Sequence, residues 1–187
     1  TPYPTLFPYT TLFRSNKLTP YERVFFDKLE NYLDKPIYFY GSIIRDDYFP
    51  QMSDIDIDIF TDNERSTITM LQNYLNLPNN SFKKCVYRLD KANTTVIKGY
   101  KCKYIDEDEN LMVEIALYNE RNKEDILAEH QGKTVKIPFY ISILLVIIKL
   151  LHYQFEILPF DYYRLYKNIL MDKCFHNNKP DFIITDV

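Results

Sequence analysis

One short stretch constrains this chain more than any other: the alternation of acidic and apolar residues from Ser53 to Ile59. Successive side chains of a β-strand point to opposite faces, so Asp54, Asp56 and Asp58 share one face and the isoleucines share the other. The isoleucine face can pack into a core, whereas unpaired carboxylates are too costly to bury. The stretch therefore predicts a strand with one buried face and one acidic face.

The acidic face needs compensating positive charge. Same-face Cα atoms of a strand lie about 6.6 Å apart, so two such carboxylates can converge on divalent ions. Like charges repel by roughly 1–4 kcal/mol at about 4 Å, depending on the dielectric, and Mg²⁺ is an ion that prefers oxygen ligands. A solvated edge strand would show the same pattern, so the strand alone leaves both interpretations open.

A glycine–serine pair, Gly41-Ser42, follows the β-prone run Ile37–Tyr40 and precedes the acidic strand. The chain has only three glycines, and one of them is used here. Glycine lets backbone approach a phosphate closely, and the serine hydroxyl and the amides of a following helix start can bind phosphate oxygens. This order of strand, Gly-Ser and acidic strand favours a polyphosphate site.

These residues resemble the pattern of the DNA polymerase β-like nucleotidyltransferase superfamily. In that family an apolar strand ends in Gly-Ser or Gly-Gly, an Asp-x-Asp strand follows, and a later strand supplies a third acid. The resemblance is carried by Gly41, Ser42, Asp54 and Asp56, and the third acid best fits Glu114, the lone acid in the apolar run 111–117. It is specific over residues 37–60 and looser over 132–165.

The resemblance implies an enzyme that transfers a nucleoside monophosphate from a nucleoside triphosphate, such as ATP, to a hydroxyl acceptor. The implied catalytic residues, which would also hold Mg²⁺ or Mn²⁺, are Asp54, Asp56 and Glu114. The implied nucleotide contacts are Gly41, Ser42, Arg45, Ser53 and Lys149. Arg164 departs from the family pattern, because a second acid is usual at its position.

Other polar and aromatic residues have ordinary structural roles as their first interpretation. We expect Asp58 to support the first two acids or to lie at the surface. The histidines, expected to be structural or solvated, are His130, His152 and His176. The tyrosines that could stack on a base, but that more commonly pack in a core or at its rim, are Tyr100, Tyr104, Tyr162 and Tyr163.

The remaining pattern predicts an α+β fold, a nucleotidyltransferase-like mixed sheet flanked by helices with a C-terminal helical segment. Expected helices cover 19–33, 42–48, 61–75, 121–130, 138–155 and 160–174, and expected strands cover 37–40, 54–60, 82–89, 94–105, 111–118 and 133–137. We expect a core at 16–137 and C-terminal helices packed on it at 138–187. Residues 1–15 contain what looks like a translated DNA-sequencing adapter, so we expect them to be non-native.

The composition of the chain limits the partners that it can be expected to bind. The net charge of −3 argues against a surface-wide field for nucleic acid. A small molecule or a protein is therefore the favoured acceptor, and nucleic acid is a less favoured one. The apolar run 137–151 is shorter than the roughly 20 residues that span a bilayer, so we expect no membrane partner.

Three cysteines without a C-x-x-C pair do not support a zinc ribbon, and reduced thiols suit a cytoplasmic protein. Two alternatives to the enzyme stay open: a catalytically silent module of the same fold that binds a nucleotide or a partner protein, and an unrelated acidic α+β protein that binds cations loosely.

Overall fold

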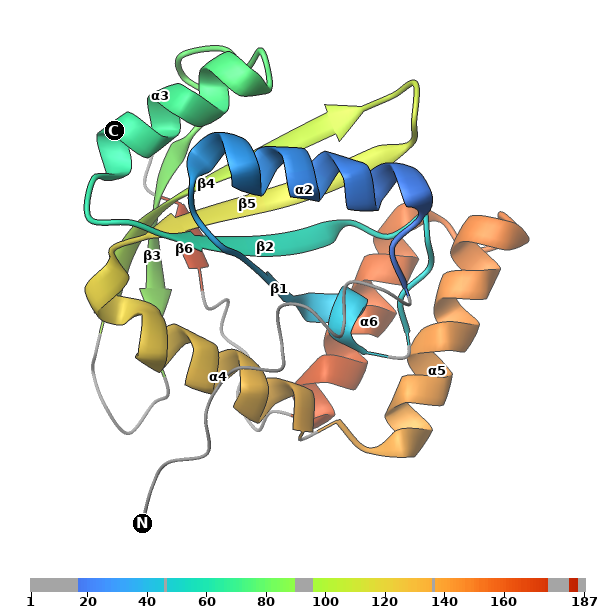
Figure 1. Cartoon of the computed structure of the whole chain (residues 1–187). Helices are drawn as coiled ribbons and strands as arrows, with labels where there is room; N and C mark the ends of the chain where they lie inside the picture. The colour runs from blue at the N-terminus through green and yellow to red at the C-terminus, as the bar shows by residue number, and fades with distance from the viewer. Residues whose placement is uncertain (1–16, 46, 90–95, 136, 175–181, 185–187) are drawn as a thin grey trace.

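Six strands form one mixed sheet in the order β1-β2-β5-β4-β3-β6 (Figure 1). Their bounds are Ile37–Tyr40 for β1, Ile55–Phe60 for β2, Lys83–Arg88 for β3, Val96–Asp106 for β4, Leu111–Tyr118 for β5 and Phe182–Ile184 for β6. Strands β2 and β5 pair in parallel, and the other neighbours pair antiparallel. This arrangement confirms the predicted α+β class with a mixed sheet.

The computed structural model describes residues 17–45, 47–89, 96–135, 137–174 and 182–184. The expected adapter-derived segment, 1–15, and His176 lie outside these residues. The expected division of the chain at residue 138 stays a prediction.

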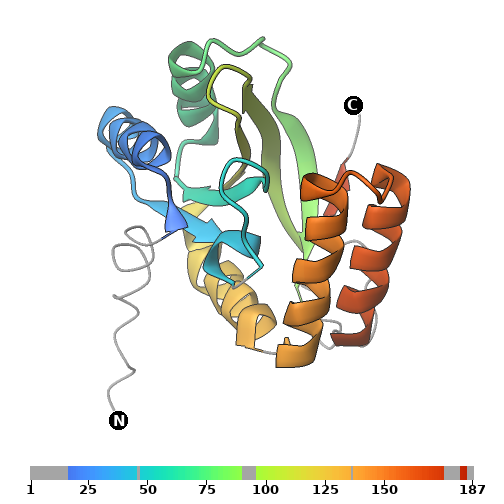
Figure 2. The same ribbon diagram turned by 90° about the vertical axis from the view of Figure 1, so that its right-hand side faces the viewer.

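Helices flank the sheet on both sides. Helices α2 (Pro20–Leu33) and α3 (Glu64–Tyr74) cover one face, and α4 (Lys123–Val135) crosses the opposite face (Figure 1). Helices α5 (Phe139–Lys149) and α6 (Phe160–Cys174) run side by side at one edge of the molecule (Figure 2). None of the described helices is long and apolar enough to cross a membrane.

The two faces of β2 differ as the alternation predicted. The isoleucines at 55, 57 and 59 are fully buried and pack with Phe26 and Leu29 of α2 and Leu71 of α3. On the other face, Phe60 joins a smaller apolar cluster with Tyr118 of β5 and Ile126 of α4. The acids of β2 therefore share their face with α4, away from the main core.

A capping box fixes the start of α2, as the sequence predicted. The Thr19 hydroxyl accepts a hydrogen bond from the amide of Glu22 (3.2 Å), and the Glu22 carboxylate accepts one from the amide of Thr19 (2.7 Å). The Tyr48 hydroxyl also donates to Glu22, over 3.2 Å. The cap thereby ties the segment before β2 to the core helix.

Three sequence predictions about elements were wrong or incomplete. Residues 133–135 of the strand expected at 133–137 are helical instead, because α4 continues through Gly132 to Val135. A glycine inside a helix lowers helix stability by only about 1 kcal/mol, so Gly132 does not have to end α4. The short run after it was therefore weak evidence for a strand. The helix expected at 42–48 is a single 3₁₀ turn, η1 (Gly41–Ile44). Strand β6 was not predicted, since its three apolar residues carry no alternation.

Candidate active site

The acidic end of β2 opens onto a cavity of about 420 Å³. Asp54 directly precedes β2, and Asp56 lies within it, opposite Glu114 of the parallel neighbour β5. Residues paired in this way share a face of the sheet, and all three carboxylates line the cavity. The fold thus brings the three acids singled out in the sequence, from two neighbouring strands, to one wall.

Gly41 lies directly against this wall. Its φ is +73°, and a β-carbon built on it would lie 2.0 Å from Oδ2 of Asp56. The left-handed region is unfavourable for L-residues with a side chain, and an overlap of this size cannot be accommodated without moving the carboxylate. Glycine is therefore needed here for both its conformation and its size. The turn η1, which begins at Gly41, also presents Ser42 to the cavity.

Negative charge is concentrated at the acidic wall. Burial and the charge of Glu114 raise the pKa of Asp56 to about 7, although the ammonium of Lys101 acts in the opposite direction. Lys101 forms an ion pair with Glu114, and Nζ of Lys103 lies 3.4 Å from Oδ2 of Asp54. Lysines of β4 thus supply part of the positive charge that the three acids require.

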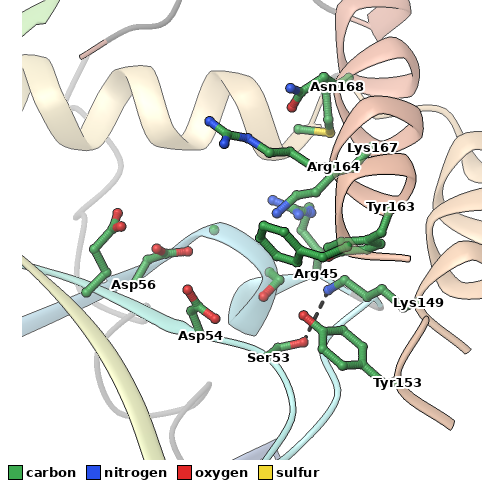
Figure 3. A pocket seen from close by; sticks show the side chains of 15 residues that line it. Arg45, Ser53, Asp54, Asp56, Lys149, Tyr153, Tyr163, Arg164, Lys167 and Asn168 are labelled. Carbon is green, nitrogen blue, oxygen red and sulfur yellow. Dashed lines mark hydrogen bonds between the residues drawn. The ribbon is translucent and has the colours of Figure 1, made fainter. Parts of the chain in front are cut away.

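Helix α6 forms a second, basic wall. Arg164, Lys167 and Asn168 are spaced three and four residues apart, so they share one side of the helix, and their side chains reach into the cavity (Figure 3). The charge of Lys167 lowers the pKa of Asp56, as expected of a cation facing the acids. Tyr153 and Tyr163 add aromatic rings to the lining beside these cations.

A buried lysine fastens the segment that precedes β2. Lys149 of α5 is 2% exposed, and its Nζ lies 3.2 Å from Oδ2 of Asp47 and 3.3 Å from Oγ of Ser53. It also donates to the carbonyl oxygen of Asp47. Nε of Arg45 donates to the other oxygen of Asp47 over 2.8 Å. Arg45, Ser53 and Lys149 therefore line the cavity while a shared partner, Asp47, holds the two cations in place.

The ionisation of this pair follows from its surroundings. Burial lowers the pKa of Lys149 to about 8, although Asp47 acts in the opposite direction. Burial alone would raise the pKa of Asp47, but the hydrogen bond and charge of Arg45, together with Lys149, outweigh it and hold the pKa below its usual value. Both pKa shifts are consistent with a charged Lys149–Asp47 pair between α5 and the segment before β2.

Comparison with known families decides the assignment. Residues 23–160 match the family model of the nucleotidyltransferase domain, which is most of the chain. This chain belongs to the nucleotidyltransferase domain family. The match confirms the superfamily and the enzyme class that the Gly-Ser and Asp-x-Asp pattern indicated. No curated protein matches the chain.

Among the solved structures similar to this nucleotidyltransferase domain, three have identities of 12–15%. A cytoplasmic RNA terminal U-transferase is 15% identical with a TM-score of 0.42, over 75% of this chain and 43% of that one. The GLD-2/RNP-8 complex is 12% identical with a TM-score of 0.40, over 78% and 52%. Cid1, an RNA terminal uridylyl transferase, is 15% identical with a TM-score of 0.38, over 75% and 43%. This chain spans about half or less of each of those chains.

The structure adds site residues that the sequence pattern missed. Arg164 was noted only as a departure from the family pattern, and Lys167 and Asn168 were not singled out. The detectable signal was the spacing of Arg164, Lys167, Asn168 and Met171, which places four cavity-lining residues on one side of a helix.

The four tyrosines that could stack on a base differ in their surroundings. Tyr163 lines the cavity of the nucleotidyltransferase domain, whereas Tyr162 is exposed and is not part of the lining. Tyr100 and Tyr104 are partly buried and pack against the core beneath α2 and α3.

Proposed function

We propose that this domain transfers a nucleoside monophosphate from a nucleoside triphosphate to a hydroxyl acceptor. The observation that carries the proposal is the opposition of charge across one cavity: Asp54, Asp56 and Glu114 on the sheet face Arg164 and Lys167 on α6. A polyphosphate bound between these walls would have its negative charge matched by the helix. Its reacting phosphorus would lie toward the acids. Positioning and charge neutralisation of this kind supply most of the catalysis in such transfers.

The turn at Gly41 and Ser42 would hold the phosphate tail from the side of the sheet. Its glycine leaves room for the carboxylate of Asp56 directly beside the turn, and the Ser42 hydroxyl can donate to a phosphate oxygen. Arg164 and Lys167 would bind the leaving pyrophosphate. Lys149 and Arg45 would act on the same ligand less directly, by fastening the segment before β2 through Asp47. Tyr163 is our candidate for the ring that stacks on the base.

The acidic wall fits a divalent cation. Burial, and after it the charge of Glu114, raise the pKa of Asp56, and a cation at this wall would oppose both effects. An all-carboxylate set suits Mg²⁺ or Mn²⁺. No three His, Cys, Asp or Glu side chains within the described ranges form a ready-made metal site. Asp54 and Glu114 would therefore turn from Lys103 and Lys101 when they bind the ion. Once bound, the ion would neutralise phosphate charge and lower the pKa of the acceptor hydroxyl.

The acceptor follows less directly from the site. The net charge of −3 supports a small molecule or a protein. One observation favours nucleic acid as a second candidate. The strand registers place Lys83 opposite Lys101, and Lys103 opposite Glu114, so these lysines share the face of the acids and continue it toward β3. Such a row could hold the phosphates of a polynucleotide end. ATP as the donor and a cytoplasmic location stay predictions.

The test is transfer of label. The protein is incubated with each α-labelled triphosphate and Mg²⁺ or Mn²⁺, and label is followed into RNA, protein and small-molecule fractions while pyrophosphate release is measured. We expect release by the wild type, and a loss of at least about 100-fold in Asp56→Asn, because the acid that faces both Gly41 and Glu114 is neutralised.

Asp62→Asn is the matched control, since Asp62 is exposed just beyond β2 and does not line the cavity. Nucleotide binding without pyrophosphate release from the wild type would favour the silent binding module. Full activity in Asp56→Asn would refute the assignment of the site.

A further inference from the structure

The third acid of β2 has a different environment from the first two. Asp58 is 1% exposed and is not among the residues that line the cavity. Its Oδ2 lies 2.8 Å from Nε2 of His130, a residue of α4, and both side chains are largely buried. A buried carboxylate without such a partner is costly, so this contact fastens α4 to β2. The sequence had suggested that Asp58 supports the first two acids or lies at the surface. The structure excludes the surface, because the side chain is buried against His130.

The same imidazole also contacts β1. The ring of His130 stacks on the ring of Tyr40, with 4.2 Å between centroids and 11° between planes. Tyr40 is the last residue of β1, directly before Gly41, and it lies opposite Asp56 in the sheet. One side chain therefore joins the strand that carries the acids to the end of the strand that leads into the turn.

Strands β1 and β2 meet beside Gly41 and Asp56, where the site leaves little room for displacement. The position that a β-carbon on Gly41 would take is only 2.0 Å from Oδ2 of Asp56, so the turn and the carboxylate fit closely. A shift of β1 relative to β2 would change the distance between the phosphate-facing turn and the acid. Displacements of about 1 Å at a reacting centre can cost about 100-fold in rate.

We propose that His130 is a positioning residue, which holds the turn at Gly41 and Ser42 in register with Asp56 by stacking on Tyr40 and hydrogen-bonding Asp58. The inference rests on the proposed nucleotidyl transfer. It assigns to α4 a role in the geometry of the site although none of the side chains described for α4 lines the cavity.

The test compares His130→Ala and Tyr40→Leu, singly and combined, with a destabilised control. Leu71→Ala is that control, because Leu71 is fully buried in α3 on the opposite face of the sheet and its truncation opens a core cavity. All proteins are assayed at a temperature where circular dichroism shows them folded. The measurements are kcat, KM for the triphosphate, and Mn²⁺ affinity by electron paramagnetic resonance.

We expect His130→Ala and Tyr40→Leu each to lower kcat about tenfold or more and to weaken Mn²⁺ binding, while Leu71→Ala leaves both unchanged. The double variant should lose little more than the worse single variant, since both disturb the same contact chain. If His130→Ala does not fold, Tyr40→Leu carries the comparison. Wild-type kcat and Mn²⁺ affinity in Tyr40→Leu, or losses no larger than in Leu71→Ala, would overturn the inference. A wild type without turnover would instead sink the proposed function, and Mn²⁺ affinity would still judge the role of His130.

Discussion

At the scale of single residues, Gly41 shows how little freedom the site has. Replacing it with alanine places a methyl group where Oδ2 of Asp56 lies, at a φ of +73°. We expect Gly41→Ala to lose transfer activity at least about tenfold, because the carboxylate must move, and to lose about 1–2 kcal/mol of stability from the left-handed backbone. Pyrophosphate release and thermal denaturation measure the two effects.

Asn110→Ala is the matched control for this substitution. Asn110 also has a positive φ, 51°, but it is exposed in the turn between β4 and β5 and does not line the cavity. It should show the backbone cost without the loss of activity. A similar loss of activity in both variants would mean that the contact between Gly41 and Asp56 has no particular role.

The pKa of Asp56 makes a second prediction at this scale. Burial and Glu114 raise that pKa to about 7, above the value of about 3.9 in an unfolded chain, so between these values the folded protein retains a proton that the unfolded chain has released. The contribution to stability is thus fully present below about pH 4 and is lost as the pH rises through about 7. In EDTA, we expect Tm to fall as the pH rises from about 4 to about 7, and to fall less in Asp56→Asn. Equal slopes in the two proteins would contradict this.

At the scale of elements, α6 supplies positive charge to the cavity opposite the acids of the strands. Arg164 and Lys167 are the cations that α6 adds to the cavity lining. We expect Arg164→Gln and Lys167→Gln each to raise KM for the triphosphate about tenfold, since a charge-assisted contact to a phosphate is removed. Lys173→Gln removes an exposed charge from the same helix outside the cavity and should leave KM unchanged. Equal KM values in the four proteins, wild type included, would exclude α6 from nucleotide binding.

Elements also show what sequence can and cannot predict here. The alternation in β2 predicted both a strand and the one face on which its acids lie, because successive side chains of a strand point to opposite faces. It did not predict the burial of Asp58, which depends on His130 of α4. The position of α6 could not be predicted in this way. Helix α6 faces the acids across a cavity, and the local sequence of Phe160–Cys174 does not indicate which part of the sheet it faces. Lys149 shows the same limit: its partner Asp47 is 102 residues away, so the sequence could suggest a phosphate contact but not the buried pair.

At the scale of the whole molecule, the cavity lies between two parts of the fold, the sheet and the helical pair α5 and α6. Its acids and glycine turn come from the sheet, and its basic wall comes from α6, which packs on α5 (Figure 2). A ligand that spans the cavity adds a bridge between the sheet and the helical pair. Because it binds only the folded protein, it must stabilise that state.

A bound triphosphate should stabilise the folded state by a measurable amount. A non-hydrolysable triphosphate with Mg²⁺, at about 100 times its dissociation constant, contributes about 2.7 kcal/mol, which corresponds to a rise in Tm of roughly 5–10 °C for a domain of this size. Thermal denaturation followed by circular dichroism measures it. The rise should shrink in EDTA, since the acids would then repel the phosphates, and it should shrink in Lys167→Gln, which weakens the helical end of the bridge. A full rise in Lys167→Gln would mean that Lys167 does not hold the ligand. No rise at millimolar ligand in the wild type would mean that the two walls do not act on one molecule.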